Sequence, residues 1–310
     1  MDRIVDIATD DLHLSAYRGF LIVSLDRQEQ GRVALDDIQA IIVHAHGVTW
    51  TTSLVVALAE RGAIMVMCAA NHAPLAIMSP IDGHHAQAGR MRAQWDAPRP
   101  MFKQLWQKII VAKIMMQASL LAAYGRDEAN ALAMMARRVR SGDPDNLEAQ
   151  AARKYWPALM GSDFRRDQQA EGANALLNYG YTIMRSCVAR SIIAAGLHPA
   201  IGLHHHNRLN GFALADDLVE PFRPLVDGLV RGMIDKGLDS VTPDTKQSLA
   251  RLIGYDLRLG GAVSPVSVAT QRLAQSLARS FEERKSALAL FDPPEPLDWA
   301  SLGRSVAAEA

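Results

Sequence analysis

The sequence contains very little cysteine and carries no net charge. Cys68 and Cys187 are the only cysteines in 310 residues and lie outside any Cys-x-x-Cys motif, so we expect neither a disulfide framework nor a thiolate metal site. Free thiols suit a reducing cytoplasm. Lys plus Arg and Asp plus Glu both number 33, so the overall charge argues neither for nor against a polyanionic partner.

The sequence also lacks an export signal and an uninterrupted apolar span. The N-terminal stretch "MDRIVDIATDDLHLS" has no basic segment followed by an apolar one, and Lys113 and Gln117 interrupt the most apolar run, residues 109–124. Neither the Gly-x-Ser-x-Gly motif of serine hydrolases nor a G-x-x-x-x-G-K-[ST] phosphate loop is present. We therefore expect a cytoplasmic protein that does not contact a membrane. We also expect that its chemistry uses no side chain as a covalent nucleophile.

The apolar pattern changes along the chain. Residues 4–80 contain short runs typical of strands, such as "GFLIVSL" and "IQAIIV", and one helical pattern, "TWTTSLVVALAERG", with Thr51 and Gly62 among its expected ends. Beyond residue 100 the patterns are long and helical. The sequence predicts an α+β protein: a small β domain (1–80), a linker (81–100), a larger, mostly α-helical catalytic domain (101–285) and a tail of uncertain order (286–310).

Charge is distributed unevenly between these parts. Residues 1–90 hold six basic and ten acidic residues, whereas the remainder holds 27 basic and 23 acidic residues. If nucleic acid binds, we expect it to bind the second part.

Three consecutive histidines, residues 204–206, precede an acidic segment. Adjacent loop residues point in different directions, so one or two of them at most could bind the same ion. Asp217 and Glu220 are three residues apart and would share a helix face. A polar loop with an acidic helix start is the alternative, and it explains Asp216 and Asp217 well. It explains Glu220 less well, since this residue is followed by "PFRP", whose Arg223 could pair with it.

A further acidic candidate lies in "DNLEAQAARKYW". Asp145 or Asn146 can cap a helix that begins just before Glu148. A solvated helix with local ion pairs is the simplest interpretation. However, the basic pair at 153–154 stands beside the aromatic pair at 155–156, a combination suited to binding a phosphate backbone and stacking an unpaired base.

Three long segments resemble one known family. They are "NLEAQAARKYWPAL", "FRRDQQAEGANALLNYGYTIMRSCVARSIIAAGLHPAIGLHHHN" and "FALADDLVEPFRPLVD", and they resemble the CRISPR-associated integrase family Cas1, particularly its type II members. The resemblance is dense over residues 140–230 and looser in the N-terminal half, where "LSAYRGFLIVSL" carries it. The last 30 or so residues find no counterpart.

The resemblance implies a divalent ion held by a glutamate, a histidine and a second acidic residue. These map onto Glu148, His205 and Glu220, with His204 and His206 kept as alternatives and Asp217 as a supporting neighbour. One imidazole and two carboxylates suit Mg²⁺ or Mn²⁺ better than a soft metal.

The resemblance also implies an activity in CRISPR adaptation. A prespacer 3′ hydroxyl would attack a phosphodiester of the CRISPR repeat, with an associated DNA endonuclease activity. A structure-selective, metal-dependent endonuclease of DNA repair and a non-catalytic DNA-binding scaffold are the alternatives. The implied partners are prespacer and repeat DNA, the small protein Cas2 and a second copy of the chain, with an RNA-guided effector nuclease as a further candidate.

Candidates for contacting DNA are the basic and aromatic residues around the motifs: Arg153, Lys154, Tyr155, Trp156, Arg165, Arg166, Tyr179 and Arg208. We expect DNA affinity to fall with salt. The resemblance also implies dimerisation through the β domain, which is consistent with an apolar sheet too small to cover both of its faces alone. His84, His85 and Arg90 in the linker either contact a partner or are simply solvated.

Overall fold

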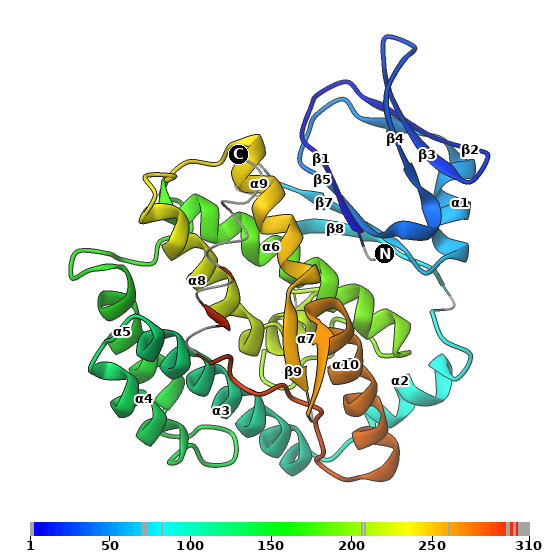
Figure 1. Ribbon diagram of the computed structural model, residues 1–310. Helices are drawn as coiled ribbons and strands as arrows, with labels where there is room; N and C mark the ends of the chain where they lie inside the picture. The colour runs from blue at the N-terminus through cyan, green and yellow to red at the C-terminus, as the bar shows by residue number, and fades with distance from the viewer. Residues whose placement is uncertain are drawn as a thin grey trace.

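The computed structural model describes residues 3–69, 74–81, 83–205, 207, 209–259, 261–295, 298, 299 and 302. Figure 1 shows that the strands of the N-terminal part form one lobe and the helices a second, larger lobe. The predicted α+β class, with a β part followed by a mostly helical part, is confirmed.

The first lobe contains two four-stranded sheets. One has the order β1 (Arg3–Ile7), β5 (Ile38–Val43), β7 (Ile64–Cys68) and β8 (Pro74–Met78), in which β8 alone is antiparallel to its neighbour. The other has the order β4 (Gln28–Ala34), β3 (Phe20–Leu25), β2 (His13–Tyr17) and β6 (Thr49–Trp50). The short helices η1 (Leu35–Asp37) and α1 (Thr52–Glu60) accompany them. Thr51 caps α1, as predicted, by accepting a hydrogen bond from the Leu54 N–H.

The sheet that contains β5 is covered on both faces by the same chain. Ile41 and Met65 belong to the core of the β lobe, whereas Ile42 and Val66, pointing the opposite way, belong to the core of the helical lobe. All six residues of β5 are buried. The expectation that this sheet lacks cover for both faces is therefore wrong, because the helical lobe covers the second face, whereas dimerisation through the β domain stays a prediction.

The helical lobe is built around α6 (Ala173–Ala194). The other helices are α2 (Gln87–Trp95), α3 (Arg99–Ala123), α4 (Glu128–Ala136), α5 (Leu147–Met160), α7 (Ala213–Leu218), η2 (Glu220–Phe222), α8 (Arg223–Ile234), α9 (Pro243–Ala250), η3 (Arg251–Gly254) and α10 (Val266–Glu283), with a hairpin of β9 (Asp256–Leu259) and β10 (Ala262–Pro265). Gly180 explains part of the "LNYGY" motif: a Cβ there would collide with Val226 of α8.

Among the described residues, α3 is the one helix long and apolar enough to cross a membrane by length and composition, yet 56% of its most apolar window is buried inside the protein. It packs against α4, α5 and α8. The helix therefore behaves as a core helix of this fold.

The segment predicted as a linker contains α2. Its Arg90 donates to Glu282 of α10 at 3.1 Å and to the Ala195 carbonyl at 3.0 Å, and it contacts His84 at 3.0 Å. The polar character of this segment thus reflects its attachment to the helical lobe.

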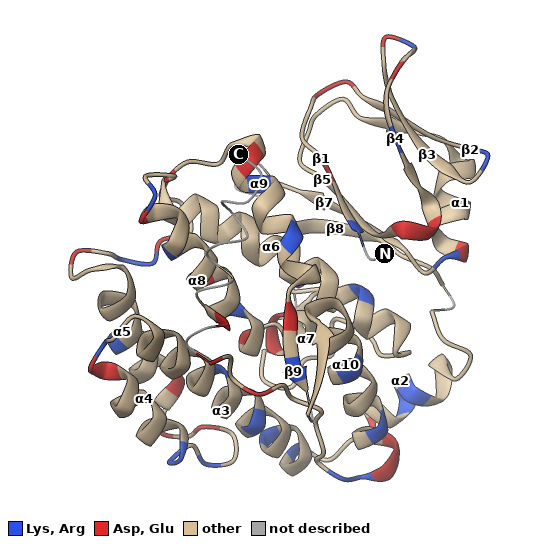
Figure 2. Cartoon of the chain, in the orientation of Figure 1, with Lys and Arg blue, Asp and Glu red and all other residues tan. Residues whose placement is uncertain are grey.

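The described part of the C-terminal tail also packs on the fold. The indole of Trp299 donates to the Ser119 hydroxyl at 2.8 Å, and the hydroxyl of Tyr255 donates to the Asp298 carbonyl at 2.6 Å. In Figure 2, the ribbon segments of positive and of negative residues are interspersed over both lobes.

Candidate active site

Two of the predicted acidic residues meet at one cation. The Nζ atom of Lys113, on α3, lies 2.6 Å from Oε1 of Glu148 and 2.5 Å from Oε2 of Glu220. Glu148 stands in the first turn of α5 and Glu220 in η2. Packing of α3 against both elements therefore brings together carboxylates that are distant in sequence.

The start of α5 is fixed by local hydrogen bonds. Asn146 adopts a left-handed conformation and accepts from the Ala149 N–H, so the predicted cap is confirmed. Asp143 accepts from the N–H groups of Leu147 and Glu148 at 2.9 and 3.0 Å. These bonds hold the backbone of Glu148 against the site.

Glu220 is anionic although its side chain is only 6% exposed. Burial raises its pKa, but the charges of Arg223 and Lys113 outweigh burial and lower the pKa to about 2. The predicted pair of Arg223 with Glu220 is present, at 2.8 Å. Burial likewise lowers the pKa of Lys113, but Glu220 and Glu148 overcome this and raise it, so the ammonium is charged.

His205 is held by Asp217, a fully buried carboxylate on α7. The imidazole Nδ1 lies 2.6 Å from Oδ1 of Asp217, and the same carboxylate accepts from the N–H groups of Leu203, His204 and His205. The hydrogen bond to Asp217 raises the pKa of His205, against the effect of burial. With Nδ1 engaged, Nε2 is the nitrogen that could bind an ion.

Gly202 permits this arrangement. A Cβ at Gly202 would lie 2.5 Å from the carbonyl oxygen of His205 and 2.8 Å from Oδ2 of Asp217. The ring of His204 makes no hydrogen bond to a carboxylate of the described residues and stacks on Trp106 of α3, with ring centroids 4.4 Å apart and planes 4° apart. The geometry thus favours His205 over His204, and His206 lies outside the described residues.

A cavity of about 380 Å³ opens beside His205. Arg166, Arg185 and Arg223 line it together with Asn178 and Tyr181. Arg185 is neutralised by Asp216 at 2.6 Å and Arg223 by Glu220. Arg166 instead donates to the amide oxygens of Asn174 and Asn178 at 2.9 and 2.5 Å and makes no ion pair with a described residue.

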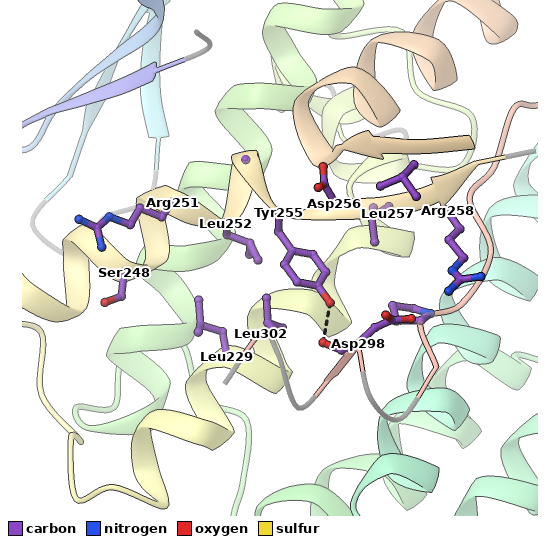
Figure 3. Close-up of a pocket in the computed structure, with 13 residues that line it drawn as sticks. Leu229, Ser248, Arg251, Leu252, Tyr255, Asp256, Leu257, Arg258, Asp298 and Leu302 are labelled. Carbon is purple, nitrogen blue, oxygen red and sulfur yellow. Dashed lines mark hydrogen bonds between the residues drawn. The ribbon is translucent and has the colours of Figure 1, made fainter. Parts of the chain in front are cut away.

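The cavity shown in Figure 3 is larger, about 440 Å³, and lies elsewhere. It is bounded by η3, β9 and the C-terminal segment, and Tyr255 crosses it to reach Asp298. None of the described residues of the predicted site lines it.

Two predicted DNA contacts are corrected. Tyr155 and Tyr179 are both fully buried, so neither ring can stack on a base. Tyr155 falls on the core face of α5 and donates its hydroxyl to Asp227 at 2.8 Å. Tyr179 packs its ring near His44 and Lys246.

The remaining candidates are distributed over different surfaces. Arg153 and Lys154 are exposed on α5, and Trp156 is half-buried against Tyr155 and Phe164. Arg165 is exposed and donates to backbone carbonyls, whereas Arg166 enters the cavity described above. Arg208 lies outside the described residues.

Three participants were missed in the sequence: Lys113, Trp106 and Asp227. Lys113 interrupts an apolar helical run, and a charge buried there requires a partner of opposite sign. That signal was available, but the identity of the partners depends on the packing of α3.

The donor chemistry of the site fits Mg²⁺ or Mn²⁺. Two carboxylates converge on one point and an oriented imidazole stands near them, a set of hard oxygen donors with one nitrogen. Within the described part of the chain, no three imidazole, thiolate or carboxylate side chains are gathered closely enough to hold an ion as they stand. The Lys113 ammonium occupies the position between the carboxylates that an ion would take.

A helical domain with convergent carboxylates, an oriented imidazole and an arginine-lined pocket has the features of a protein that acts on phosphate-bearing substrates. The chain belongs to the family of CRISPR associated protein Cas1, whose family model matches residues 5–248. The resemblance found in the sequence is confirmed.

Individual relatives support this assignment. The CRISPR-associated endonuclease Cas1 of Neisseria meningitidis serogroup C (strain 8013) is 38% identical over 249 residues, which cover 79% of this chain and 81% of that protein. The CRISPR-associated endonuclease Cas1 2 of Pyrobaculum aerophilum is 26% identical over 293 residues, 89% of this chain and 98% of the relative.

Solved structures share the fold. A casposase bound to integration product superposes with a TM-score of 0.78 at 20% identity, covering 92% of each chain. A chain of a Cas6-RT-Cas1–Cas2 complex gives a TM-score of 0.74 at 17% identity, covering 94% of this chain and 36% of that one. At such identities the likeness establishes the architecture.

Proposed function

We propose that this protein is a CRISPR adaptation integrase that joins the 3′ hydroxyls of prespacer DNA to phosphodiesters of the CRISPR repeat, with an associated DNA endonuclease activity. The observation that carries the proposal is the convergence of Glu148 and Glu220 on one cation beside an imidazole that Asp217 orients. Family membership supports it.

Glu148, Glu220 and Nε2 of His205 would hold Mg²⁺ or Mn²⁺, which supplies Lewis-acid stabilisation of the negative charge that develops on the phosphate. Asp217 engages Nδ1 of the imidazole, which leaves Nε2 as the nitrogen that would bind the ion. Arg223 keeps Glu220 ionised. In the reaction one P–O bond forms between the prespacer 3′ oxygen and the repeat phosphorus, and one P–O bond of the repeat breaks. The attacking 3′ hydroxyl loses a proton, and the 3′ oxygen released from the repeat gains one.

The arginine-lined cavity would position the DNA. Arg166 offers a guanidinium whose side-chain hydrogen-bond acceptors are neutral amide oxygens, and a planar guanidinium can bind a phosphate through two hydrogen bonds. Arg185 and Arg223 are already paired with carboxylates, so they form part of the cavity wall but contribute little unneutralised positive charge.

The proposed partners are DNA, Cas2 and a second copy of the chain, and the effector nuclease remains a further expectation. Solved structures with this fold include a Cas1–Cas2 complex and a casposase on its integration product. For the homodimer, the β lobe offers exposed apolar side chains at Tyr17, Phe20 and Leu75.

Hydrolysis at the same site is the second candidate. The relatives are named endonucleases, and the His205 side chain is 44% exposed, so water can reach the site. A structure-selective endonuclease would use water in place of the 3′ hydroxyl. A non-catalytic scaffold is disfavoured because binding DNA requires no pair of convergent carboxylates.

The decisive experiment combines the protein, Cas2, a short DNA with free 3′ hydroxyls and a plasmid carrying a repeat, with Mn²⁺ or EDTA. We expect covalent joining that requires the ion and disappears in Glu148→Gln, whereas Glu128→Gln, an exposed acid on α4, retains it. Nicking without joined product would favour the endonuclease. Joining that survives Glu148→Gln would favour the scaffold.

A further inference from the structure

Lys113 is a buried cation in apolar surroundings. Its side chain is 11% exposed, and its helical neighbours Ile109, Ile110 and Ile114 are completely buried. An ammonium in such a place is tolerated only when carboxylates compensate its charge. Glu148 and Glu220 do so, at 2.6 and 2.5 Å.

The same contacts hold the two carboxylates together. Without a cation between them, Glu148 and Glu220 would repel each other across a poorly solvated space. Arg223 contacts the other oxygen of Glu220, Oε1, and therefore does not fill the shared position. Lys113 is the described residue that contacts both carboxylates.

We propose that Lys113 is a built-in competitor of the divalent ion, an inference that rests on the proposed role of Glu148 and Glu220 as its ligands. The ammonium holds the carboxylates in place while the ion is absent and leaves the shared position when the ion binds. Two cations cannot occupy that point together, so the affinity for the ion is lower than the two carboxylates and the imidazole alone would give. The four-carbon side chain of lysine is flexible enough to withdraw.

The test measures Mn²⁺ binding to the full chain in the absence of DNA, by calorimetry and by electron paramagnetic resonance of the free ion. Lys113→Met removes the competing charge and nearly preserves side-chain volume. We expect it to bind Mn²⁺ about 10- to 100-fold more tightly, the range over which changes beside the ligands alter metal affinity. Lys108→Met, the same change at an exposed position of α3, should bind as the unmodified protein does, and Glu220→Gln should bind more weakly.

Thermal unfolding provides a second readout. Lys113→Met leaves the buried Glu220 and the partly exposed Glu148 without their shared cation, so the variant should be less stable in EDTA and should gain more in Tm from Mn²⁺ than the unmodified protein. If it does not fold in EDTA, the variant Lys113→Met/Glu220→Gln, which removes one charge of each sign, should fold there. That variant should bind Mn²⁺ more tightly than Glu220→Gln alone.

Several outcomes would overturn the inference. Unchanged or weaker Mn²⁺ binding in Lys113→Met, with binding still dependent on Glu220, would show that the lysine does not compete but is neutral or helps to position the ligands. In that case the proposed function stands. If neither Lys113→Met nor Glu220→Gln alters Mn²⁺ binding, the ion binds elsewhere, and the metal site of the proposed function fails together with the inference.

Discussion

The buried carboxylate of Asp217 holds His205 through both its ring and its backbone. Oδ1 of Asp217 lies 2.6 Å from the imidazole Nδ1 and 3.3 Å from the His205 nitrogen of the main chain. A carboxylate that accepts the Nδ1 proton selects the tautomer in which Nε2 can donate its lone pair. The segment from Leu203 to His205 is thus organised around one acid.

Asp217→Asn tests this relationship. An amide can present its NH₂ group to Nδ1, which then becomes an acceptor, so Nε2 carries the proton and can no longer bind an ion. We expect Mn²⁺ affinity and DNA joining to fall about 10- to 100-fold. Asp163→Asn, at an exposed position, serves as the control. Unchanged affinity in Asp217→Asn would remove Nε2 from the site.

Gly202→Ala tests the space required by the histidine loop. The added Cβ would lie 2.5 Å from the His205 carbonyl oxygen, so the loop must shift. We expect a loss of about 1–3 kcal/mol in the free energy of unfolding and weaker Mn²⁺ binding. Gly211→Ala is the matched control, since a Cβ there meets nothing within 4 Å. Urea unfolding of both variants measures the difference, and equal stabilities would contradict the predicted clash.

Asp227 should make stability depend on pH. Burial raises its pKa from 3.8 to about 6, although the hydroxyls of Tyr181 and Tyr155 oppose this. Between pH ~4 and ~6 the unfolded chain has lost this proton while the folded protein keeps it, so stability falls as the pH rises through that window, by at most ~3 kcal/mol. Urea unfolding of Asp227→Asn should lack this component. The same pH dependence in both proteins would assign it to another group.

Local signals in the sequence predicted helix ends better than long-range packing. Asn146 and Gly62 mark helix ends through their own backbone chemistry, and both positions were predictable. Lys113 contacts Glu148 and Glu220 only because α3 packs against α5 and η2, and no local sequence pattern specifies that packing. The polar composition of residues 81–100 suggested a linker. This composition was misleading because α2 is held by long-range hydrogen bonds of Arg90 rather than by an apolar face.

The burial of Tyr155 and Tyr179 had a similar cause. Each aromatic stands next to polar or basic residues in sequence, which suggested an exposed stacking surface. Burial depends instead on which side of the helix a residue occupies. On α5, Leu147, Ala151 and Tyr155 recur every four residues and lie on the side that faces the core. A candidate surface residue must therefore be checked against the helical period before a binding role is assigned.

Tyr155→Phe tests that correction. The change removes a hydroxyl that donates to Asp227 but preserves the buried ring. We expect a loss of about 1–2 kcal/mol in the free energy of unfolding and no change in DNA affinity. Fluorescence anisotropy with labelled DNA checks the second expectation, and weakened DNA binding by a fully folded variant would restore Tyr155 as a contact.

Arg166→Gln tests the proposed phosphate position. Arg166 lines the cavity beside His205 with only neutral side-chain partners, so its charge is available to DNA. We expect about tenfold weaker DNA binding and a salt dependence reduced by about one phosphate contact.

Arg165→Gln is the control, because the preceding arginine is exposed and donates to the carbonyls of Ser162 and Phe164 outside the cavity. Anisotropy titrations at several salt concentrations separate the two arginines. If Arg166→Gln weakens binding no more than Arg165→Gln does, the cavity contributes only general positive charge. A reduced salt slope in Arg166→Gln alone would instead place a DNA phosphate in the cavity that His205 lines.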